Sequence, residues 1–119
     1  MADKTITVMA DFGMGPYAWL KDSSDKTSFV GGNIADAVSG FSGFLPLSAR
    51  LEHDFSEWVT EFESHYDEHS FDWRNFNSRG VALSKRLKCE VKDAYDVVYV
   101  APSEDPIDGR RLRVEITEE

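Results

Sequence analysis

The chain has 119 residues, and its 22 acidic and 13 basic side chains give a net charge of −9. This charge disfavours binding to nucleic acid or to anionic membrane surfaces, because both require Lys and Arg to neutralise phosphate groups. Hydrophobic residues make up 41% of the sequence and aromatic residues 13%, which is enough for a buried core. We therefore expect a folded protein in which residues 1–119 form a single domain.

The cysteine count and the length of the apolar runs indicate the cellular compartment in which the protein is expected. One cysteine, Cys89, excludes an internal disulfide, and a chain that depends on its core alone suits a reducing environment. No apolar run approaches the roughly 20 residues needed to span a bilayer. The N-terminal sequence MADKTITV also lacks the hydrophobic region of a signal peptide. These features predict a protein of the cytoplasm.

The N-terminal part of the sequence predicts strands separated by turns. Residues 5–10 alternate in polarity and are rich in β-branched side chains, so they predict a first strand. Residues 16–21 predict a second strand that pairs back on the first across a turn rich in Gly and Pro. A short third strand is expected at residues 27–30. The glycines of the segment Gly31–Pro46 indicate irregular structure, with a helical turn at Ile34–Val38.

The clearest predicted element is an amphipathic helix that follows Pro46, with Ser48 as its N-cap. Its apolar side chains recur at the spacing that places them on one face of a helix. They are Leu51, Phe55, Trp58, Val59, Phe62 and Tyr66. The rest of its surface is acidic, with no Lys or Arg after Arg50: Glu52, Asp54, Glu57, Glu61, Glu63, Asp67 and Glu68.

A second helix is predicted to begin after Asp72, whose carboxylate can cap the first turn, with Phe71 and Phe76 placed for a hydrophobic staple. Gly80 lies in its middle at a cost of about 1 kcal/mol relative to Ala, which predicts close approach of a neighbouring element. The short linker Asp67–Phe71 predicts that the two helices are antiparallel. The basic residues of the second helix then lie beside the acidic helix as its internal complement: Arg74, Arg79, Lys85, Arg86, Lys88 and Lys92.

Two strands are predicted after the helices. Residues 95–101 are apolar on both sides, as in a central strand, and residues 112–117 alternate, as in a strand with one exposed face. The order β-β-(β)-α-α-β-β therefore predicts an α+β fold. In this fold a mainly antiparallel sheet carries an antiparallel two-helix hairpin on one face. The loop between the last two strands is acidic and contains Glu104, Asp105 and Asp108.

The sequence has no strong motif for catalysis, a cofactor or a metal. His65 and His69 have the spacing of metal ligands on a helix, but the glutamate of the H-E-x-x-H motif is missing, so we expect surface histidines. Gly13 and Gly15 follow a strand but lack the third glycine of a dinucleotide-binding motif. Cys89 is expected to be a small residue partly buried by the next strand. These observations favour a protein that is not an enzyme.

The C-terminal half of the chain carries a resemblance to a known group of proteins. The residues concerned are Asp72-Trp73, Phe76-Asn77, Arg79-Gly80, Leu83, Leu87-Lys88, Val98-Tyr99 and Pro102–Pro106. In this pattern the chain resembles small acidic bacterial proteins of the toxin-immunity type. The resemblance implies an α+β fold and a protein partner, and it brings no catalytic residues with it.

The leading hypothesis is a non-enzymatic protein-binding module, an immunity or inhibitor protein that masks a basic partner such as a toxin. Its predicted partner-binding residues are Glu52, Glu57, Glu61, Glu63, Glu68, Glu104, Asp105 and Asp108. Tyr17 or Trp19 could serve as an exposed anchor. Two alternatives stay open: a small enzyme or ligand-binding domain with a pocket near the Gly31–Pro46 loop, and a homo-oligomeric structural protein. The sequence does not fix the oligomeric state.

Overall fold

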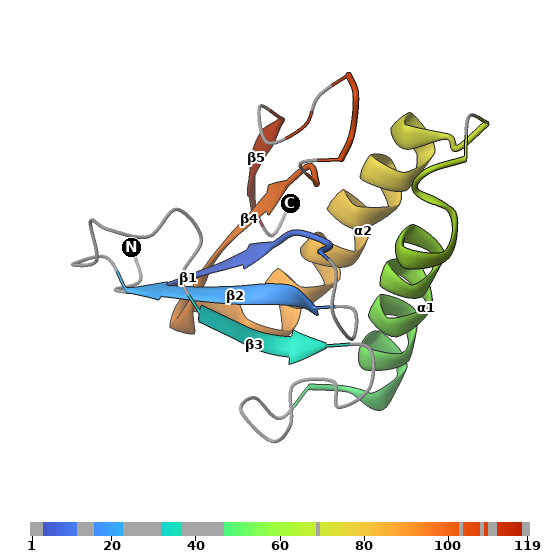
Figure 1. The fold of residues 1–119 in the computed structure, drawn as a ribbon. Helices are drawn as coiled ribbons and strands as arrows, with labels where there is room; N and C mark the ends of the chain where they lie inside the picture. Colours follow the sequence, from blue (N-terminus) through green and yellow to red (C-terminus); the bar gives the residue numbers. More distant parts are fainter. Residues whose placement is uncertain are drawn as a thin grey trace.

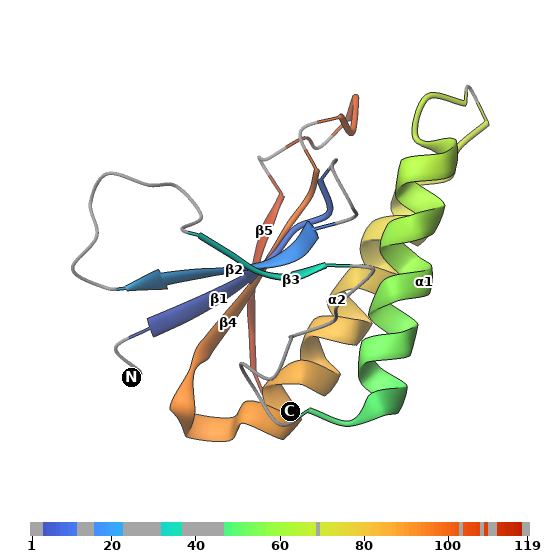
Figure 2. The same cartoon turned by 60° about the horizontal axis from the view of Figure 1, so that its bottom comes forward.

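The structure, a computed structural model, describes residues 4–11, 16–22, 32–36, 47–68, 70–102, 104–107, 109 and 112–117. The helices and strands follow the order β1 (Lys4–Val8), β2 (Pro16–Asp22), β3 (Gly32–Asp36), α1 (Ala49–His65), α2 (Trp73–Val91), a 3-10 turn (Lys92–Ala94), β4 (Asp96–Val100) and β5 (Arg113–Ile116). Figures 1 and 2 show the strands in one layer and the two helices side by side in a second layer. This arrangement confirms the predicted α+β fold.

The strands form one sheet with the order β3-β2-β1-β4-β5. β1 pairs with β2, β2 with β3, and β4 with β5 in antiparallel fashion, whereas β1 and β4 are parallel, with Ile6 opposite Val97. The sheet is thus mainly antiparallel, as predicted, with one parallel pair at its centre. The parallel pair arises because the chain, after passing through both helices, returns to the free side of β1.

β3 occupies a segment for which the sequence predicted irregular structure and a helical turn, and that prediction was wrong for Gly32–Asp36. Gly32 pairs with Leu20 of β2, and Ala35 is buried in the core. The glycine suggested a break, but pairing with β2 satisfies the backbone and overrides this local preference. The third strand predicted at residues 27–30 and the turn between β1 and β2 lie outside the described residues.

The core side of α1 buries the apolar residues that its periodicity predicted: Leu51, Phe55, Trp58, Val59 and Phe62. Trp58 is central among them, because its indole stacks on Phe76 of α2 with ring centroids 4.6 Å apart. Its Nε1 also donates a hydrogen bond of 3.0 Å to the carbonyl oxygen of Phe76. The two helices are therefore joined by an aromatic contact and by a buried hydrogen bond at the same place.

Both helices begin at the caps that the sequence predicted. Ser48 Oγ accepts a hydrogen bond from the backbone N–H of Leu51 at 3.2 Å. Asp72 accepts one from the N–H of Asn75 at 3.0 Å. Phe71 and Phe76 form the predicted staple, with ring centroids 5.5 Å apart. These local contacts fix where the helices start, and hence which side chains of α1 face outward.

Gly80 lies at the point of closest approach between α2 and its neighbours. A Cβ atom at this position would lie 2.7 Å from an indole carbon of Trp58 on α1, and it would also overlap the ring of Tyr99 on β4. The predicted close approach is confirmed, with a helix and the sheet both involved. A larger residue would force these rings apart.

Gly80→Ala is expected to lower the free energy of unfolding by about 1–3 kcal/mol through overpacking. Helix propensity alone would predict the opposite, a gain of about 1 kcal/mol. Chemical denaturation followed by circular dichroism measures the difference. Ser78→Ala, at an exposed position of the same helix, is the matched control and should be neutral or slightly stabilising. A stabilised Gly80→Ala variant would contradict the close approach.

Candidate functional site

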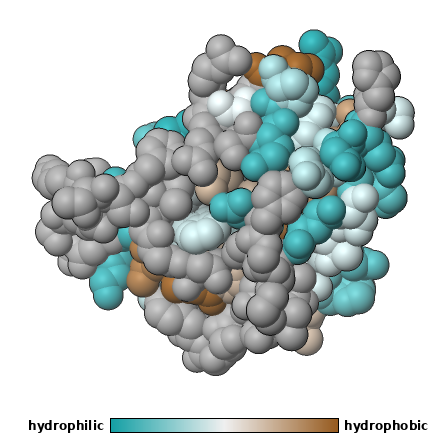
Figure 3. Space-filling view, in the orientation of Figure 1, coloured by the Kyte–Doolittle hydropathy of each residue, from teal (hydrophilic) through white to brown (hydrophobic). Residues whose placement is uncertain are grey.

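A stripe of polar side chains runs along α1 on the side away from the core. Its members recur every three or four residues, so they share one helix face. They line two adjoining shallow depressions: His53, Ser56, Glu57, Thr60, Glu61, Ser64, His65 and Glu68. We call these residues the outer stripe. Figure 3 shows hydrophilic residues along the side of the molecule where Figure 1 places α1.

The most exposed carboxylates of the outer stripe are paired with histidines. Glu57 has 68% of its side chain exposed and lies 3.3 Å from Nε2 of His53. Glu68 is 52% exposed and lies 2.7 Å from Nδ1 of His65. A histidine compensates a carboxylate only when it is protonated, whereas Arg and Lys always carry charge at neutral pH. Both carboxylates remain exposed at the surface of the outer stripe despite these pairs.

Two carboxylates are paired with arginines of α2 instead: Glu61, at the edge of the outer stripe nearest α2, and Asp54. Arg79 Nη1 donates to Glu61 Oε2 at 2.7 Å, and Arg86 Nη1 donates to Asp54 Oδ2 at 2.7 Å. The Arg86 guanidinium holds the pKa of the Asp54 carboxyl below its usual range, mainly through this hydrogen bond. These pairs confirm that arginines of α2 serve as a complement to the acidic helix.

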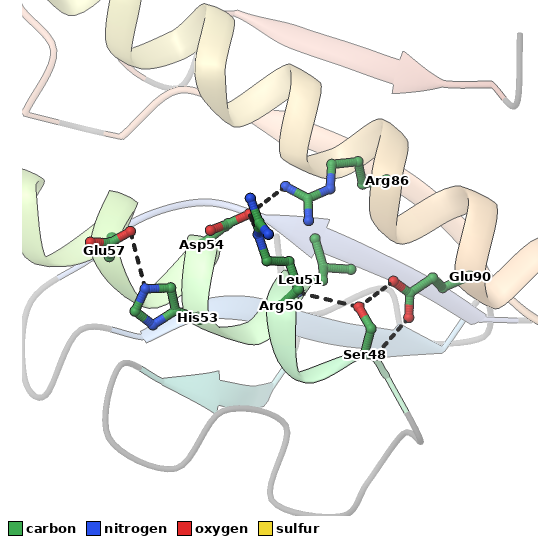
Figure 4. A network of polar contacts seen from close by, with 8 residues as sticks. All are labelled: Ser48, Arg50, Leu51, His53, Asp54, Glu57, Arg86 and Glu90. Atoms are coloured by element: carbon green, nitrogen blue, oxygen red, sulfur yellow. Dashed lines mark hydrogen bonds and ion pairs between the residues drawn. The ribbon is translucent and has the colours of Figure 1, made fainter.

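The start of α1 is fixed to the end of α2 by a second set of polar contacts, shown in Figure 4. One oxygen of the Glu90 carboxylate accepts from the backbone N–H of Ser48, and the other accepts from its hydroxyl, both at 2.8 Å. Glu90 therefore extends the cap of α1 from the neighbouring helix. In the same view Asp54 points toward Arg86, and His53 points toward Glu57. The helix that carries the outer stripe is thus joined to α2 by Glu90 at its start and by the α1–α2 turn at its end.

Within the described residues, one group of side chains has the spacing of metal ligands. The ligand atoms of His53, Asp54 and Glu57 all lie within 4.8 Å of one another. However, Asp54 is already bonded to Arg86, and Arg50 approaches it to 3.7 Å. A metal ion would meet two guanidinium groups there, so the group suits ion pairing better than cation binding. His69, the partner of His65 in the predicted spacing, lies outside the described residues.

The acidic loop between β4 and β5 differs from the expectation. Asp105 is only 4% exposed. Its Oδ2 accepts from Asn77 Nδ2 at 2.9 Å and its Oδ1 from the N–H of Ile107 at 2.8 Å. Asp105 therefore does not fit the predicted role of presenting a carboxylate to a partner. Glu104 is half-buried, and Asp108 lies outside the described residues.

Tyr99 completes the network around Asp105. Its hydroxyl donates to Asn77 Oδ1 at 2.7 Å, so a chain of side-chain hydrogen bonds runs from β4 through α2 to the loop. Burial raises the pKa of the Tyr99 hydroxyl, and the negative charge of Asp105 raises it further. The hydroxyl therefore stays a proton donor at every physiological pH. The network holds the loop in place.

The structure contradicts one of the two aromatic anchors suggested from the sequence. Tyr17 is fully buried and stacks on Phe55 with ring centroids 4.8 Å apart, so its prediction as an exposed anchor was wrong. Trp19 is half-buried, and its Nε1 donates to the carbonyl of Met9. Cys89, expected to be partly buried, is exposed on α2.

Ile107 was missed by the sequence reasoning. Among the described residues, Ile107 is the large hydrophobic residue that is exposed, with a relative exposure of 56%. It lies in a short loop without periodicity, so no pattern singled it out. The available signal was one large aliphatic residue in an otherwise polar and proline-bounded segment. The pocket predicted near the Gly31–Pro46 loop involves residues outside the described ones.

Comparison with known proteins identifies the family. The model of a family described as Serratia CdiI immunity protein-like matches residues 4–102, from β1 to just beyond β4. The chain belongs to this family. Membership confirms the resemblance to immunity proteins of bacterial toxin systems, and it implies that a toxin is the partner. No curated protein and no solved structure matches the chain.

No helix in the described part of the chain is both long enough and apolar enough to cross a bilayer.

The His65–Glu68 pair predicts a measurable titration. Glu68 raises the pKa of His65 above 6.5, first through the hydrogen bond and then through its charge. Because the folded-state pKa is the higher one, the pair stabilises the fold fully below the unfolded pKa and loses this effect as pH rises through the folded pKa. Glu68→Gln should move the pKa of His65 down toward 6.5 in an NMR titration. Glu90→Gln, at the other end of the hairpin, should leave it unchanged, and an equal shift in both variants would contradict the assignment.

Proposed function

We propose that this protein neutralises a bacterial toxin in the cytoplasm by covering a basic surface of the toxin with the outer stripe of α1. Membership of the immunity protein-like family supports the immunity role. The observation that carries the location is the exposure of two carboxylates of the outer stripe, Glu57 with 68% and Glu68 with 52% of the side chain exposed. In this proposal the whole chain acts as one domain, without a catalytic step or a cofactor.

The geometry of α1 supports the choice of surface. Successive residues of a helix are rotated by about 100°, so His53, Glu57 and Ser64 point away from the core. By the same rotation Glu52 and Glu63 lie on the flank opposite α2, where they are half-buried. A binding protein of this kind would therefore meet its partner with the centre of the stripe, and Glu52 and Glu63 would lie at its rim.

The overall charge supports a basic partner. With a net charge of −9 the protein attracts a cationic surface over several ångströms, which raises the rate of encounter. Charges at an interface mainly set the association rate and the orientation of the partners. A toxin that acts on a polyanion such as nucleic acid would carry the matching basic surface, because it must neutralise phosphate groups itself.

A double charge reversal tests the proposal. Glu57→Lys with Glu68→Lys should weaken binding to its toxin by about tenfold or more, equivalent to at least 1.4 kcal/mol. The effect should fall mostly on the association rate and should shrink as salt is added. Surface plasmon resonance at two ionic strengths measures both.

Glu115→Lys is the matched control for this experiment. Glu115 is an exposed carboxylate on β5, so its reversal changes the net charge without touching the outer stripe. It should change the affinity by less than the loss in the double variant. If Glu115→Lys weakens the complex as much as the double variant does, the binding surface is not the outer stripe. The same conclusion follows if the double variant binds the toxin as tightly as the unchanged protein.

A further inference from the structure

The β4–β5 loop carries an exposed apolar side chain, Ile107, that has no role in the proposed function. Ile107 is 56% exposed, although Asp105, two residues before it, is only 4% exposed. Figure 3 shows a hydrophobic area at the top of the molecule, over the β4–β5 loop, with hydrophilic residues beside it. An exposed aliphatic side chain with polar neighbours matches the layout of protein interfaces, in which an apolar centre is surrounded by a polar rim.

The backbone under Ile107 is fixed by buried groups. Its N–H donates to Oδ1 of Asp105 at 2.8 Å, and the other oxygen of that carboxylate accepts from Asn77. The N–H of Asp105 donates to the carbonyl of Pro102, and its carbonyl accepts from the N–H of Gly109. Burying a carboxylate is unfavourable unless it is hydrogen-bonded, so these bonds are needed to hold Asp105 inside. Their result is a loop tip that presents Ile107 in a fixed position.

A loop whose backbone is already fixed loses little conformational entropy when it binds. Ordering one flexible side chain or loop at an interface costs about 0.5–1.5 kcal/mol per side chain, and a preorganised anchor avoids most of that cost. The anchored tip is attached to α2 through Asn77, which lies in the second turn of that helix. Ile107 is therefore rigid with respect to the helix hairpin that carries the outer stripe.

The loop and the α1–α2 turn lie at the same end of the molecule in both Figure 1 and Figure 2. The outer stripe reaches this end at Glu68, and the turn continues with the exposed carboxylate of Asp72. Glu104 adds a further acidic residue within the loop itself. An apolar residue therefore stands at an end of the molecule that also carries negative charge, which selects a partner with the opposite charge around an apolar pocket.

We propose that Ile107 is the apolar anchor of the toxin interface, inserted into an apolar pocket of the toxin whose rim carries Lys or Arg. Asp105 is a positioning residue that acts through Ile107. This inference rests on the proposed function, because it takes the same toxin as the partner, but it assigns the affinity to a different side chain. The carboxylates bring the two proteins together, and Ile107 holds them.

The experiment compares Ile107→Ala with Ile107→Leu in binding to the toxin. Ile107→Ala should raise Kd by about 10- to 100-fold, mainly through faster dissociation. Ile107→Leu keeps the aliphatic volume and should stay within about threefold of the unchanged protein. The thermal unfolding curves of both variants should superimpose on that of the unchanged protein, because the side chain is mostly exposed.

A double-mutant cycle tests the role of Asp105. Asp105→Asn should weaken binding when Ile107 is present and should add little in the Ile107→Ala background, because its effect passes through Ile107. A merely structural role would give the same loss in both backgrounds. If Asp105→Asn fails to fold, the comparison of Ala and Leu at position 107 still decides the proposal.

The outcomes separate this inference from the proposed function. An Ile107→Ala variant that binds the toxin as tightly as the unchanged protein overturns the anchor, whatever the charge reversals show. If the charge reversals do not change toxin binding, the outer stripe is not the binding surface. The comparison of Ile107→Ala with Ile107→Leu then still decides whether Ile107 is the anchor. If Ile107→Ala leaves toxin binding intact but changes the mass of the protein in solution, the residue contacts a second copy of the chain, and the inference is wrong.

Discussion

The structure depends on the contact at Gly80, where the backbone of α2 lies against the rings of Trp58 and Tyr99. The absence of a side chain at this one position lets α2 pack closely on α1 and on β4 at the same time. Trp58 then reaches the carbonyl of Phe76, and Tyr99 reaches the side chain of Asn77. Helix packing and the hydrogen bonds that hold the β4–β5 loop thus follow from the same close approach. Separating α2 from the sheet at Gly80 would disturb both.

The charges of the hairpin divide into two groups with different consequences. Asp54 and Glu61 are bonded to arginines of α2, and such partly exposed pairs help align the helices without driving their association, which burial of the aromatic face supplies. Glu57 and Glu68 face solvent and meet only histidines among the pairs described. Carboxylates in these positions contribute little to the hairpin, so their effect lies in the field that they project. This division supports our proposal that the outer stripe meets the partner.

The sequence was sufficient for features that depend on local spacing. The helix faces, the caps at Ser48 and Asp72 and the need for Gly80 follow from periodicity and from the chemistry of single residues, and all were predicted. The misses depend on contacts between distant segments. β3 exists because β2 pairs with it, and Tyr17 is buried because Phe55 stacks on it from another element.

The candidate site shows the same limit. The acidic character of α1 was visible in the sequence, but composition could not tell which carboxylates face α2 and which face solvent. Asp105 belonged to an acidic loop by sequence, and its burial depends on Asn77, which lies 28 residues earlier in the chain. Ile107 is exposed as a consequence, because the same network fixes the loop tip. The hydrogen bond from Asn77, which the sequence does not reveal, thus holds Asp105 in the interior while Ile107 is exposed.

An immunity protein must bind its toxin quickly and release it slowly, and these two demands call for different chemistry. Charge acts at a distance and accelerates encounter, but ions in solution screen it, and an exposed pair adds little to the lifetime of a complex. An apolar side chain acts only on contact, and its burial is insensitive to salt at moderate concentration. We propose the outer stripe for the first kind of interaction and Ile107 for the second. Both are attached to α2, through the arginine pairs and through Asn77, so the same packing at Gly80 sets the distance between them.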